Sequence, residues 1–343
     1  MRFRAYRLRH AARLAKRFLS FRERGVFRGP MSSRRVAILD IGSNSIKVLV
    51  AERDARGQTS ALLSKTLDAR ISAGISRNKP FLTNESMNRG LAAIEELLTS
   101  AAPHAPQQTV LVATSAVRDA DNGSEFRERV RQATGHQVRI LSGSEEANAI
   151  GRGLTCDPAL AALANFYVFD LGGGSLECLS FQARQIESVA SLQLGCVRLT
   201  EQWIPDPSQP IPPTELANIQ NHTRATLAAS GFTFRLPQGA VTVGTGGTIT
   251  TIRALLAARV GKTLEQTDPD VQLTHLRPMM DQLAALSLEE RKKIPGMPPG
   301  RADVFPTALA TLIAIAEFGG FTAYRHSFYN LRYGVAAETL DGM

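Results

Sequence analysis

The same acidic, glycine- and serine-rich turn occurs twice in this chain, each time between two apolar runs. "DIGSNS" occupies residues 40–45, after "VAILD" and before "IKVLVAER", and "DLGGGS" occupies residues 170–175 within "NFYVFDLGGGSLECLSF". The apolar residues on both sides alternate as they do in strands, so each turn is predicted to close a β-hairpin. A chain that repeats such a unit is expected to fold as two similar halves.

Helical segments separate further strands, which predicts an α/β protein. The sequence "SFYNLRYGVAAETL" at the end is interpreted as a last strand that leads into a C-terminal helix. Helical spacing, together with Gly135 as a C-terminal signal and Ser142 or Ser144 as an N-cap, indicates helices. These helices lie at 85–98, 126–135, 142–154, 214–230, within 239–258 and at 304–320.

The net charge of +9 is concentrated at the N-terminus. Residues 1–35 carry eleven Arg and Lys16 against Glu23 alone, so the remainder of the chain has a net charge of −2. We therefore expect no specific nucleic-acid partner for the body of the protein. The basic extension, residues 1–33, has three interpretations: an arm for membrane surfaces or polyanions, a transit peptide, or upstream sequence in front of a true start at Met31.

Cysteine content and hydropathy argue against two other classes. Cys156, Cys178 and Cys196 form no CxxC pair and are odd in number, which indicates neither a zinc knuckle nor a disulfide framework. A reducing cytoplasm is the expected location. The longest weakly polar stretch, "TALATLIAIAEFGGF", is shorter than the roughly 20 apolar residues that span a bilayer, so no membrane span is predicted.

The paired turns are suited to phosphate. Main-chain N–H groups of a tight turn converge on an anion, and serine hydroxyls add donors. An Asp beside that phosphate would repel it unless a cation lay between them, and Mg²⁺ takes one or two carboxylates plus phosphate oxygens. Neither turn matches GxxxxGK[ST] or GxGxxG, which lead into helices. "GTGGT", residues 244–248, does lead into a helix, where it forms either a further anion site or a simple helix–strand packing contact.

Seven motifs in this order resemble the exopolyphosphatase/guanosine pentaphosphate phosphohydrolase family. They are "DIGSNSIK", "ATSAVRDA", "SGSEEA", "DLGGGSLE", "LQLGCVRLTE", "GTGGTIT" and "GRADV", and the resemblance runs from about Val36 to Ala337. It implies a two-domain fold like that of actin, sugar kinases and Hsp70 (ribonuclease H-like), with a duplicated phosphate-binding β-hairpin and an interdomain cleft. We expect domains at 34–149 and 150–332, with residues 333–343 returning to the first domain.

The resemblance also implies the chemistry. The family uses Mg²⁺ and water to remove the terminal phosphate of inorganic polyphosphate or the 5′ phosphate of guanosine pentaphosphate. The motif "SGSEEA" makes Glu146 the expected general base, whereas Glu145 is expected only to meet the helix dipole in the first turn. Asp170 and Glu177 flank the second turn and are the expected Mg²⁺ ligands, with Asp40 facing them directly or through water.

The expected phosphate-binding residues come from both turns, from "GTGGT" and from two arginines. Arg118 and Arg301 could instead form surface ion pairs with Asp119 and Asp303. The full set is Gly42, Ser43, Asn44, Ser45, Arg118, Gly172, Gly173, Gly174, Ser175, Gly246, Gly247, Thr248 and Arg301.

Three residues depart from the family pattern. Leu176 replaces a Thr, which removes a hydroxyl donor from the second turn; Lys47 stands at a variable position; and Tyr333 replaces the Glu of "LREG". The resemblance therefore implies a form without the C-terminal helical HD-type domain of longer members, and the six scattered histidines are not expected to supply a second metal site. The chain is expected to be a short form, compatible with a homodimer, that accepts short chains or nucleotides as well as long polymer.

The leading hypothesis is therefore a cytoplasmic Mg²⁺-dependent hydrolase, an exopolyphosphatase-type enzyme that acts on phosphoanhydride bonds. One alternative is a small-molecule kinase of the same superfamily, against which the "SGSEEA" helix argues. The other is a catalytically weak sensor that binds polyphosphate or guanosine tetraphosphate, against which the retained Glu146, Asp170 and Glu177 argue.

Overall fold

The computed structural model describes residues 34–54, 57–76, 80–237 and 239–343. Residues 34–343 form one compact unit. The predicted basic extension, with its three interpretations, lies outside the described residues. The boundaries 34–149 and 150–332 stay a prediction, although the unit is built on two separate sheets.

The first half is built on a five-stranded sheet with the order β3-β2-β1-β4-β5. β1, β2 and β3 are antiparallel to one another in sequence order, whereas β4 runs parallel to β1 and β5 runs parallel to β4. The strands are β1 (Arg34–Ile41), β2 (Ile46–Arg53), β3 (Thr59–Leu67), β4 (Gln108–Ala113) and β5 (Val138–Ile140).

The second half repeats this arrangement in a six-stranded sheet with the order β10-β11-β9-β6-β7-β8. Here β6, β7 and β8 form the antiparallel part, and β9 and β11 run parallel to β6, so only β10 is additional. The predicted duplication of the hairpin is confirmed. The strands are β6 (Phe166–Leu171), β7 (Leu176–Gln182), β8 (Gln185–Leu192), β9 (Val241–Thr245), β10 (Asp270–Gln272) and β11 (Ala323–His326).

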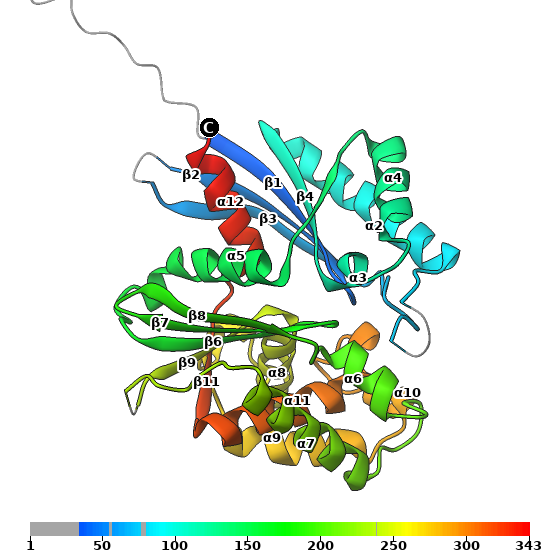
Figure 1. Cartoon of the computed structure of the whole chain (residues 1–343), viewed down its shortest axis with the longest axis vertical. Coiled ribbons are helices and arrows are strands. Elements are labelled where there is room, and N and C mark those ends of the chain that lie inside the picture. The colour runs from blue at the N-terminus through cyan, green and yellow to red at the C-terminus, as the bar shows by residue number, and fades with distance from the viewer. Residues whose placement is uncertain (1–33, 55–56, 77–79, 238) are drawn as a thin grey trace, which may run out of the picture. The chain divides into compact units, whose positions relative to one another are not determined.

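Helices cover both faces of the first sheet (Figure 1). Leu39 of β1 packs with residues of α2 and α4, whereas its neighbour Ile38 packs with residues of α5 and α12, because successive strand residues face opposite sides. The helices are α2 (Asn84–Ala101), α3 (Ser115–Arg118), α4 (Gly123–Thr134), α5 (Gly143–Thr155), α6 (Cys196–Trp203), α7 (Pro213–Ala229), α8 (Gly246–Arg259), α9 (Leu273–Ala284), α10 (Leu288–Arg291), α11 (Phe305–Gly319) and α12 (Leu331–Asp341), with the 3₁₀ helices η1 (Ala102–His104), η2 (Pro158–Leu160), η3 (Leu264–Gln266) and η4 (Pro299–Arg301).

α5 joins the two sheets. Its buried residues pack in one cluster with Ile38 of β1 and with Phe166 and Phe181 of β6 and β7, and Figure 1 shows α5 between the sheets with α12 beside it. α5 and α12 touch through their backbones, because a Cβ on Gly334 would lie only 1.8 Å from the carbonyl oxygen of Ala149. This contact fixes the helix whose first turn carries Glu146.

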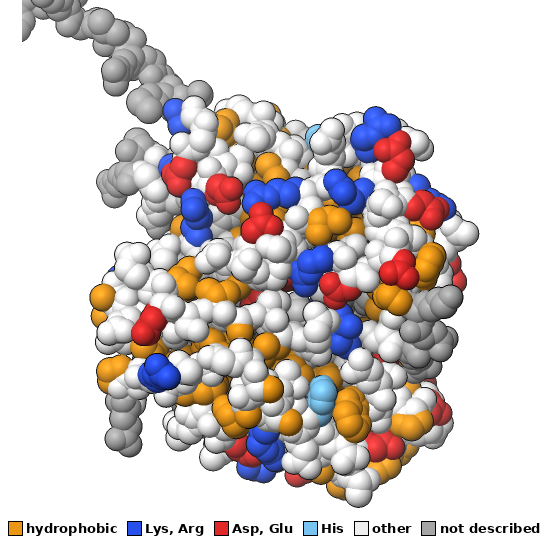
Figure 2. Space-filling model, in the orientation of Figure 1, with side chains coloured by type: hydrophobic (Ala, Val, Ile, Leu, Met, Phe, Trp, Pro, Cys, Tyr) orange, Lys and Arg blue, Asp and Glu red, His pale blue; other side chains and the backbone are white. Residues whose placement is uncertain are grey.

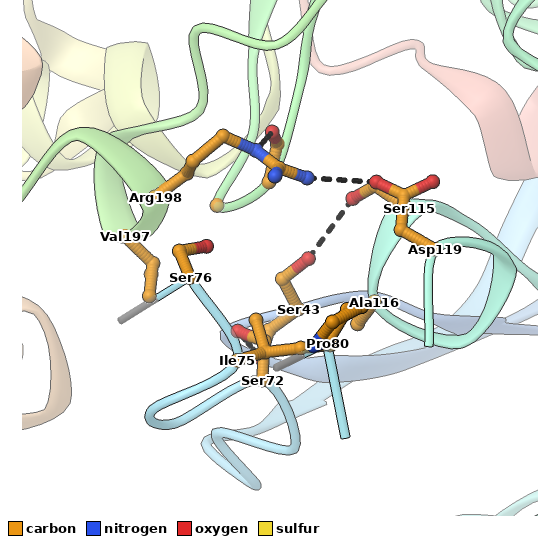
Figure 3. Close-up of a pocket in the computed structure, with 12 residues that line it drawn as sticks. Ser43, Ser72, Ile75, Ser76, Pro80, Ser115, Ala116, Asp119, Val197 and Arg198 are labelled. Atoms are coloured by element: carbon orange, nitrogen blue, oxygen red, sulfur yellow. Dashed lines mark hydrogen bonds and ion pairs between the residues drawn. The ribbon is translucent and has the colours of Figure 1, made fainter. Parts of the chain in front are cut away.

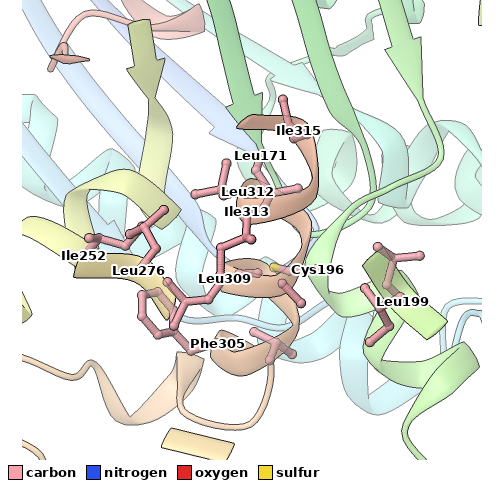
Figure 4. Packing of buried hydrophobic residues seen from close by; sticks show 14 of the residues in the cluster. Leu171, Cys196, Leu199, Ile252, Leu276, Phe305, Leu309, Leu312, Ile313 and Ile315 are labelled. Atoms are coloured by element: carbon pink, nitrogen blue, oxygen red, sulfur yellow. The ribbon is translucent and has the colours of Figure 1, made fainter. Parts of the chain in front are cut away.

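The core of the second half surrounds α11 (Figure 4). Twelve consecutive residues of α11, from Phe305 to Ala316, are buried, as expected for a helix that is apolar on all sides and lies inside a domain. Leu199 of α6, Ile252 of α8 and Leu276 of α9 belong to the same cluster. No helix within the described ranges is both long and apolar enough to cross a bilayer.

Charged side chains of both signs are intermingled on the face that Figure 2 displays. This agrees with the near-neutral net charge of the chain beyond residue 35.

The predicted helices and most strands are present, but the last strand is placed wrongly by the sequence. β11 occupies Ala323–His326, and residues 327–330 form a connection to α12. The aromatic residues Phe328 and Tyr329 produced the strand prediction, yet they line a cavity and extend no sheet. The helices α3, α6, α9 and α10 and the strands β3 and β10 were not predicted.

Candidate active site

The two hairpin turns touch each other. A Cβ on Gly173 would lie 3.0 Å from Ser43 Cβ, and one on Gly174 would lie 2.8 Å from Ser43 Oγ. The hydroxyls of Ser43 and Ser115, which begins α3, are 3.0 Å apart and hydrogen-bonded. Residues 42–45 and 172–175 therefore form one continuous polar surface from both halves of the chain.

A small polar cavity, here called the carboxylate cavity, opens beside these turns. It brings together most of the site residues predicted from the sequence, including all four acids. Its lining consists of Asp40, Gly42, Ser43, Asn44, Ser45, Lys47, Thr114, Ser115, Glu146, Asp170, Leu171, Gly172, Gly173, Ser175, Glu177, Gly247 and Arg301.

Glu146 is held at the start of α5 by local sequence. Ser142 caps the helix, and Glu145 closes a capping box by accepting a hydrogen bond from Ser142 N at 2.8 Å. Glu145 therefore has a structural role in the first turn, although the sequence predicted only an interaction with the helix dipole. The next side chain, Glu146, is only 6% exposed and accepts a hydrogen bond from Arg118 Nη1 at 2.8 Å. Burial raises the pKa of Glu146 to about 7, although the Arg118 contact opposes the shift.

Asp170 and Glu177 are directly paired neighbours on β6 and β7. Glu177 is 2% exposed and accepts a hydrogen bond from Ser191 Oγ at 2.9 Å. Burial, followed by repulsion from Glu146 and Asp170, raises the pKa of Glu177 well above its usual value. The Asp170 side chain is partly exposed, but burial of its carboxyl group raises its pKa to about 6. The positive charge of Lys47 opposes this shift.

Asp40 occupies the equivalent position in the first hairpin. Its partner across the strands is Lys47, whose Nζ lies 3.5 Å from Asp40 Oδ2. Lys47 was noted in the sequence only as a variable position. Its side chain in fact places a positive charge at the edge of the carboxylate cavity.

The two predicted arginines have different surroundings. Arg118 pairs with both Glu146 and, at 3.3 Å, Asp119, so the expected ion pair with Asp119 exists alongside the contact to the acid. Arg301 lines the carboxylate cavity beside Gly247. Asp303 pairs with Arg70 and not with Arg301.

The "GTGGT" turn also reaches the second hairpin. Thr248 Oγ1 donates a hydrogen bond to the carbonyl oxygen of Leu171 at 2.8 Å, so this hydroxyl fixes the hairpin. Gly246 has φ of +81°, and a Cβ there would lie 2.1 Å from Asp170 Oδ1. A larger residue would displace the carboxylate. Gly246 and Thr248 do not line the carboxylate cavity, whereas Gly247 does.

A second, smaller cavity adjoins the turns, and Figure 3 shows its lining. Arg198 of α6 lines this cavity, and no role was predicted for it from the sequence. It donates to Gly174 O at 2.9 Å and to Asp119 Oδ2 at 2.7 Å, and so it connects the second turn to the first half of the chain. Its motif, "LQLGCVRLTE", supported the resemblance but gave no role for the arginine.

The structure changes the interpretation of two residues that depart from the family pattern, Leu176 and Tyr333. The side chain of Leu176 is fully buried in the core of the second half and does not face the carboxylate cavity. The prediction that Leu176 removes a hydroxyl donor from the second turn therefore does not apply at this position. Tyr333 packs against Tyr329 in an adjoining cavity, with ring centroids 4.1 Å apart and the ring planes tilted by 36°.

The acids suit a hard divalent cation. Among residues 34–54, 57–76, 80–237 and 239–343, no three His, Cys, Asp or Glu side chains converge into a ready metal cage. Mg²⁺ needs none, because it is usually held by one or two carboxylates and completes its shell with water and phosphate. The neighbouring carboxyl groups of Asp170 and Glu177, with their raised pKa values, would suit such a site.

The fold is that of several solved structures. An exopolyphosphatase from Cytophaga hutchinsonii superposes with a TM-score of 0.79 and 23% identity, over 90% of this chain and 99% of that one. The Aquifex aeolicus PPX-GPPA enzyme gives a TM-score of 0.72 and 24% identity, over 89% and 99% of the two chains. The predicted two-sheet α/β fold class is thereby confirmed.

Sequence comparison adds the family. A guanosine-5′-triphosphate,3′-diphosphate pyrophosphatase from Vibrio atlanticus is 29% identical over 309 residues, which cover 89% of this chain but only 59% of that relative. The model of the Ppx/GppA phosphatase family matches residues 24–342, nearly the whole length of the chain. The chain therefore belongs to the Ppx/GppA phosphatase family.

Proposed function

We propose that this protein is a Mg²⁺-dependent phosphohydrolase that removes the terminal phosphate of inorganic polyphosphate or of guanosine pentaphosphate. The observation that carries the proposal is the carboxylate cavity, where enclosed acids from both halves meet two glycine- and serine-rich turns. Family membership and the names of the relatives support the same reaction class.

In this proposal the two turns hold the terminal phosphate. Backbone N–H groups and the hydroxyls of Ser43, Ser45 and Ser175 surround its oxygens, and Arg301 adds a positive charge from the side. Phosphoryl transfer depends mainly on positioning and on stabilising the charge of the transferred group. Hydrogen-bond donors that are fixed in this way both position the phosphate and stabilise its charge.

Glu146 is the proposed general base. Arg118 orients its carboxylate through the 2.8 Å contact, so the free oxygen can accept a proton from a water in the carboxylate cavity. The water oxygen then bonds to the terminal phosphorus, the bridging P–O bond breaks, and the shortened chain leaves with the electron pair. Such a base contributes about 10²- to 10⁴-fold to the rate.

Asp170 and Glu177 would hold Mg²⁺, with Asp40 facing them. When bound, the ion neutralises charge on the phosphate oxygens that the carboxylates would otherwise repel. We further propose a reducing compartment such as the cytoplasm, because the three cysteines are free thiols and two of them are buried.

The test is phosphate release by wild type and Glu146→Gln, measured with polyphosphates of several lengths and with guanosine pentaphosphate. We expect turnover by the wild type and a loss of about two to four orders of magnitude in kcat for the variant, with substrate binding kept. Glu145→Gln is the matched control, because Glu145 caps the helix and does not line the carboxylate cavity. Near-normal turnover by Glu146→Gln would show that Glu146 is not the general base.

A parallel incubation with ATP and candidate acceptors distinguishes hydrolysis from a kinase reaction. Free phosphate supports the proposal, and a phosphorylated acceptor would replace it. Tight binding of polyphosphate without any release of phosphate would indicate a sensor.

A further inference from the structure

Two charged residues without a part in the proposed reaction, Arg198 and Asp119, connect the second turn to Glu146. Arg198 Nε donates to Gly174 O at 2.9 Å, and Arg198 Nη2 donates to Asp119 Oδ2 at 2.7 Å (Figure 3). The other oxygen of Asp119 accepts a hydrogen bond from Arg118 Nε at 3.3 Å, and Arg118 Nη1 donates to Glu146 Oε2 at 2.8 Å. The side chains of Arg198, Asp119, Arg118 and Glu146 are here called the charge chain.

The second turn is bound by α6 through the carbonyl oxygens of its three glycines. The hydrogen bonds run from Cys196 N to Gly172 O at 3.0 Å, from Val197 N to Gly173 O at 2.9 Å, and from Arg198 Nε to Gly174 O at 2.9 Å. The C=O and N–H groups of a planar trans peptide point in opposite directions, so the N–H groups of these peptides are directed away from α6. Arg198 therefore helps to orient the N–H groups to which the proposed function assigns the phosphate.

The charge chain is largely enclosed. Its two arginine side chains are each 18% exposed, and that of Asp119 is 25% exposed. Ion pairs at this depth are screened less by salt than surface pairs. Arg118 Nη1 also donates to Leu141 O at 2.9 Å, immediately before the cap of α5. A displacement of Arg118 would therefore disturb both the carboxylate of Glu146 and the start of the helix that carries it.

The distance between Glu146 and the second turn matters for the proposed reaction. A general base must lie within hydrogen-bond reach of the water that it activates, and a misplacement of about 1 Å can cost roughly 100-fold in rate. Glu146 precedes β6 in the chain, whereas Arg198 follows β7 and β8. The charge chain is thus a polar connection between the two halves at the point where base and phosphate must be aligned.

α6 has another contact with the first half that lies outside the charge chain. Glu201 accepts hydrogen bonds from Gly74 N at 2.6 Å and from Ser76 N at 2.9 Å. It follows Arg198 by three residues in the same motif, "LQLGCVRLTE". Both side chains attach α6 to the first half, but of the two only Arg198 belongs to the charge chain.

We propose that Asp119 and Arg198 are positioning residues that align Glu146 with the phosphate held by the second turn. Arg198 holds the turn and Asp119 together. Asp119 sets the orientation of Arg118, which holds the carboxylate of Glu146. This inference rests on the proposed function and adds two residues to its site.

The test measures phosphate release from tripolyphosphate and from guanosine pentaphosphate by the full chain and its variants. We expect Asp119→Asn to lower kcat by about 10- to 100-fold with less than about a threefold change in KM. Arg198→Met should lower kcat to a similar extent and should also raise KM, because it loses the contact with the turn. An unchanged kcat in either variant would overturn the proposal.

The same two changes are then made in the Glu146→Gln protein. There they should lower kcat by less than about threefold more, because a positioning residue loses its effect once the base that it positions has been removed. The rise in KM for Arg198→Met should remain. Equal losses of kcat in the two backgrounds would show that Asp119 and Arg198 do not act through Glu146.

Glu201→Gln is the matched control on the same helix. It weakens the other attachment of α6 and should keep kcat within about threefold of the wild type, and circular dichroism should show a retained fold in all variants. If Glu201→Gln lowers kcat as much as Arg198→Met, α6 is only a structural support and the proposal fails.

Urea unfolding separates this inference from the proposed function. If the wild type releases phosphate from neither compound, the proposed function fails. Midpoint shifts that do not add for Arg198→Met and Glu146→Gln, but do add for Glu201→Gln and Glu146→Gln, would still support the charge chain, since members of one ion-pair network are coupled. Additive shifts for both pairs would exclude it.

Discussion

The hairpins β1–β2 and β6–β7 differ at one functional position in otherwise matching frames. In each hairpin an Asp near the end of the first strand pairs with the residue seven positions later, and a bulge follows at the same offset in the second strand. The residue opposite Asp40 is Lys47, whereas the residue opposite Asp170 is Glu177. The first hairpin supplies its own cation, and the second places two acids side by side.

This difference assigns separate tasks to two copies of one structure. Asp40 already has a cation 3.5 Å away, so it gains less from a metal ion. Asp170 and Glu177 are held with raised pKa values, and a divalent cation would relieve their repulsion. Under the proposed function, this difference favours Asp170 and Glu177 as the main metal ligands, with phosphate contacts from both turns.

The largest effect is expected when the second hairpin is made to resemble the first. Glu177→Lys should lower Mg²⁺-dependent phosphate release by about three orders of magnitude, because a metal stabilises transition-state charge by several kcal/mol. Circular dichroism should show a retained fold. As a control at the equivalent position of the first hairpin, Lys47→Gln should lower release by about tenfold or less, since it leaves Asp170 and Glu177 in place. An equal loss in the two variants would mean that the hairpins do not differ in this way.

A smaller effect concerns α5, which both hairpins share as a support. Gly334→Ala should lower the free energy of unfolding by about 1–3 kcal/mol, because the added methyl group overpacks the contact with Ala149. Denaturant unfolding measures this, and kcat should fall with it as Glu146 shifts. Gly342→Ala is the control, since a Cβ there would meet no atom closer than 3.7 Å. Equal stability of the two variants would contradict the role given to the α5–α12 contact.

The smallest expected effect is on the pH dependence of stability, and it comes from the second half only. Burial, followed by the nearby charge of Arg253, lowers the pKa of His326 to about 3. Its ring nitrogens contact Arg253 Nη1 at 2.9 Å and Thr250 Oγ1 at 3.1 Å. As the pH falls below about 6.5, the imidazole of His326 is therefore protonated in the unfolded chain but stays neutral in the folded chain.

The contribution of His326 to the free energy of unfolding is therefore complete above about pH 6.5. As the pH falls from about 6.5 toward 3, the free energy of unfolding decreases by up to about 1.4 kcal/mol per pH unit. Denaturant unfolding between pH 7 and pH 5.5 should show a shallower loss for His326→Gln than for the wild type. Parallel curves for the two proteins would show that His326 does not titrate in this way.

Local sequence was sufficient to predict the parts of the site that depend on short-range pattern. A hairpin with a turn of fixed length brings Asp170 and Glu177 together. A cap and a helix start predict where Glu145 and Glu146 lie, but only the resemblance of "SGSEEA" to the family motif singled out Glu146. The alternation of apolar residues around each turn made both hairpins visible, because strand periodicity does not depend on the remainder of the chain.

Features that depend on contacts between distant segments were missed. Arg198 reaches Asp119 across 79 positions, and no local pattern links them. α9 contains Pro278, which weakened its helical signal, although Leu276, Met279 and Leu283 form a buried face. The segment 327–330 resembled a strand because its aromatic residues were attributed to a sheet and not to a cavity.

The most direct test of the difference between the hairpins is a Mg²⁺ titration of phosphate release by Asp170→Asn and Asp40→Asn. The two changes are chemically identical and occupy equivalent positions. The account predicts that the half-saturating Mg²⁺ concentration rises about 10- to 100-fold for Asp170→Asn, which loses a direct carboxylate ligand, and clearly less for Asp40→Asn, whose carboxylate is already paired with Lys47. Equal shifts in the two variants, or no shift for Asp170→Asn, would contradict it.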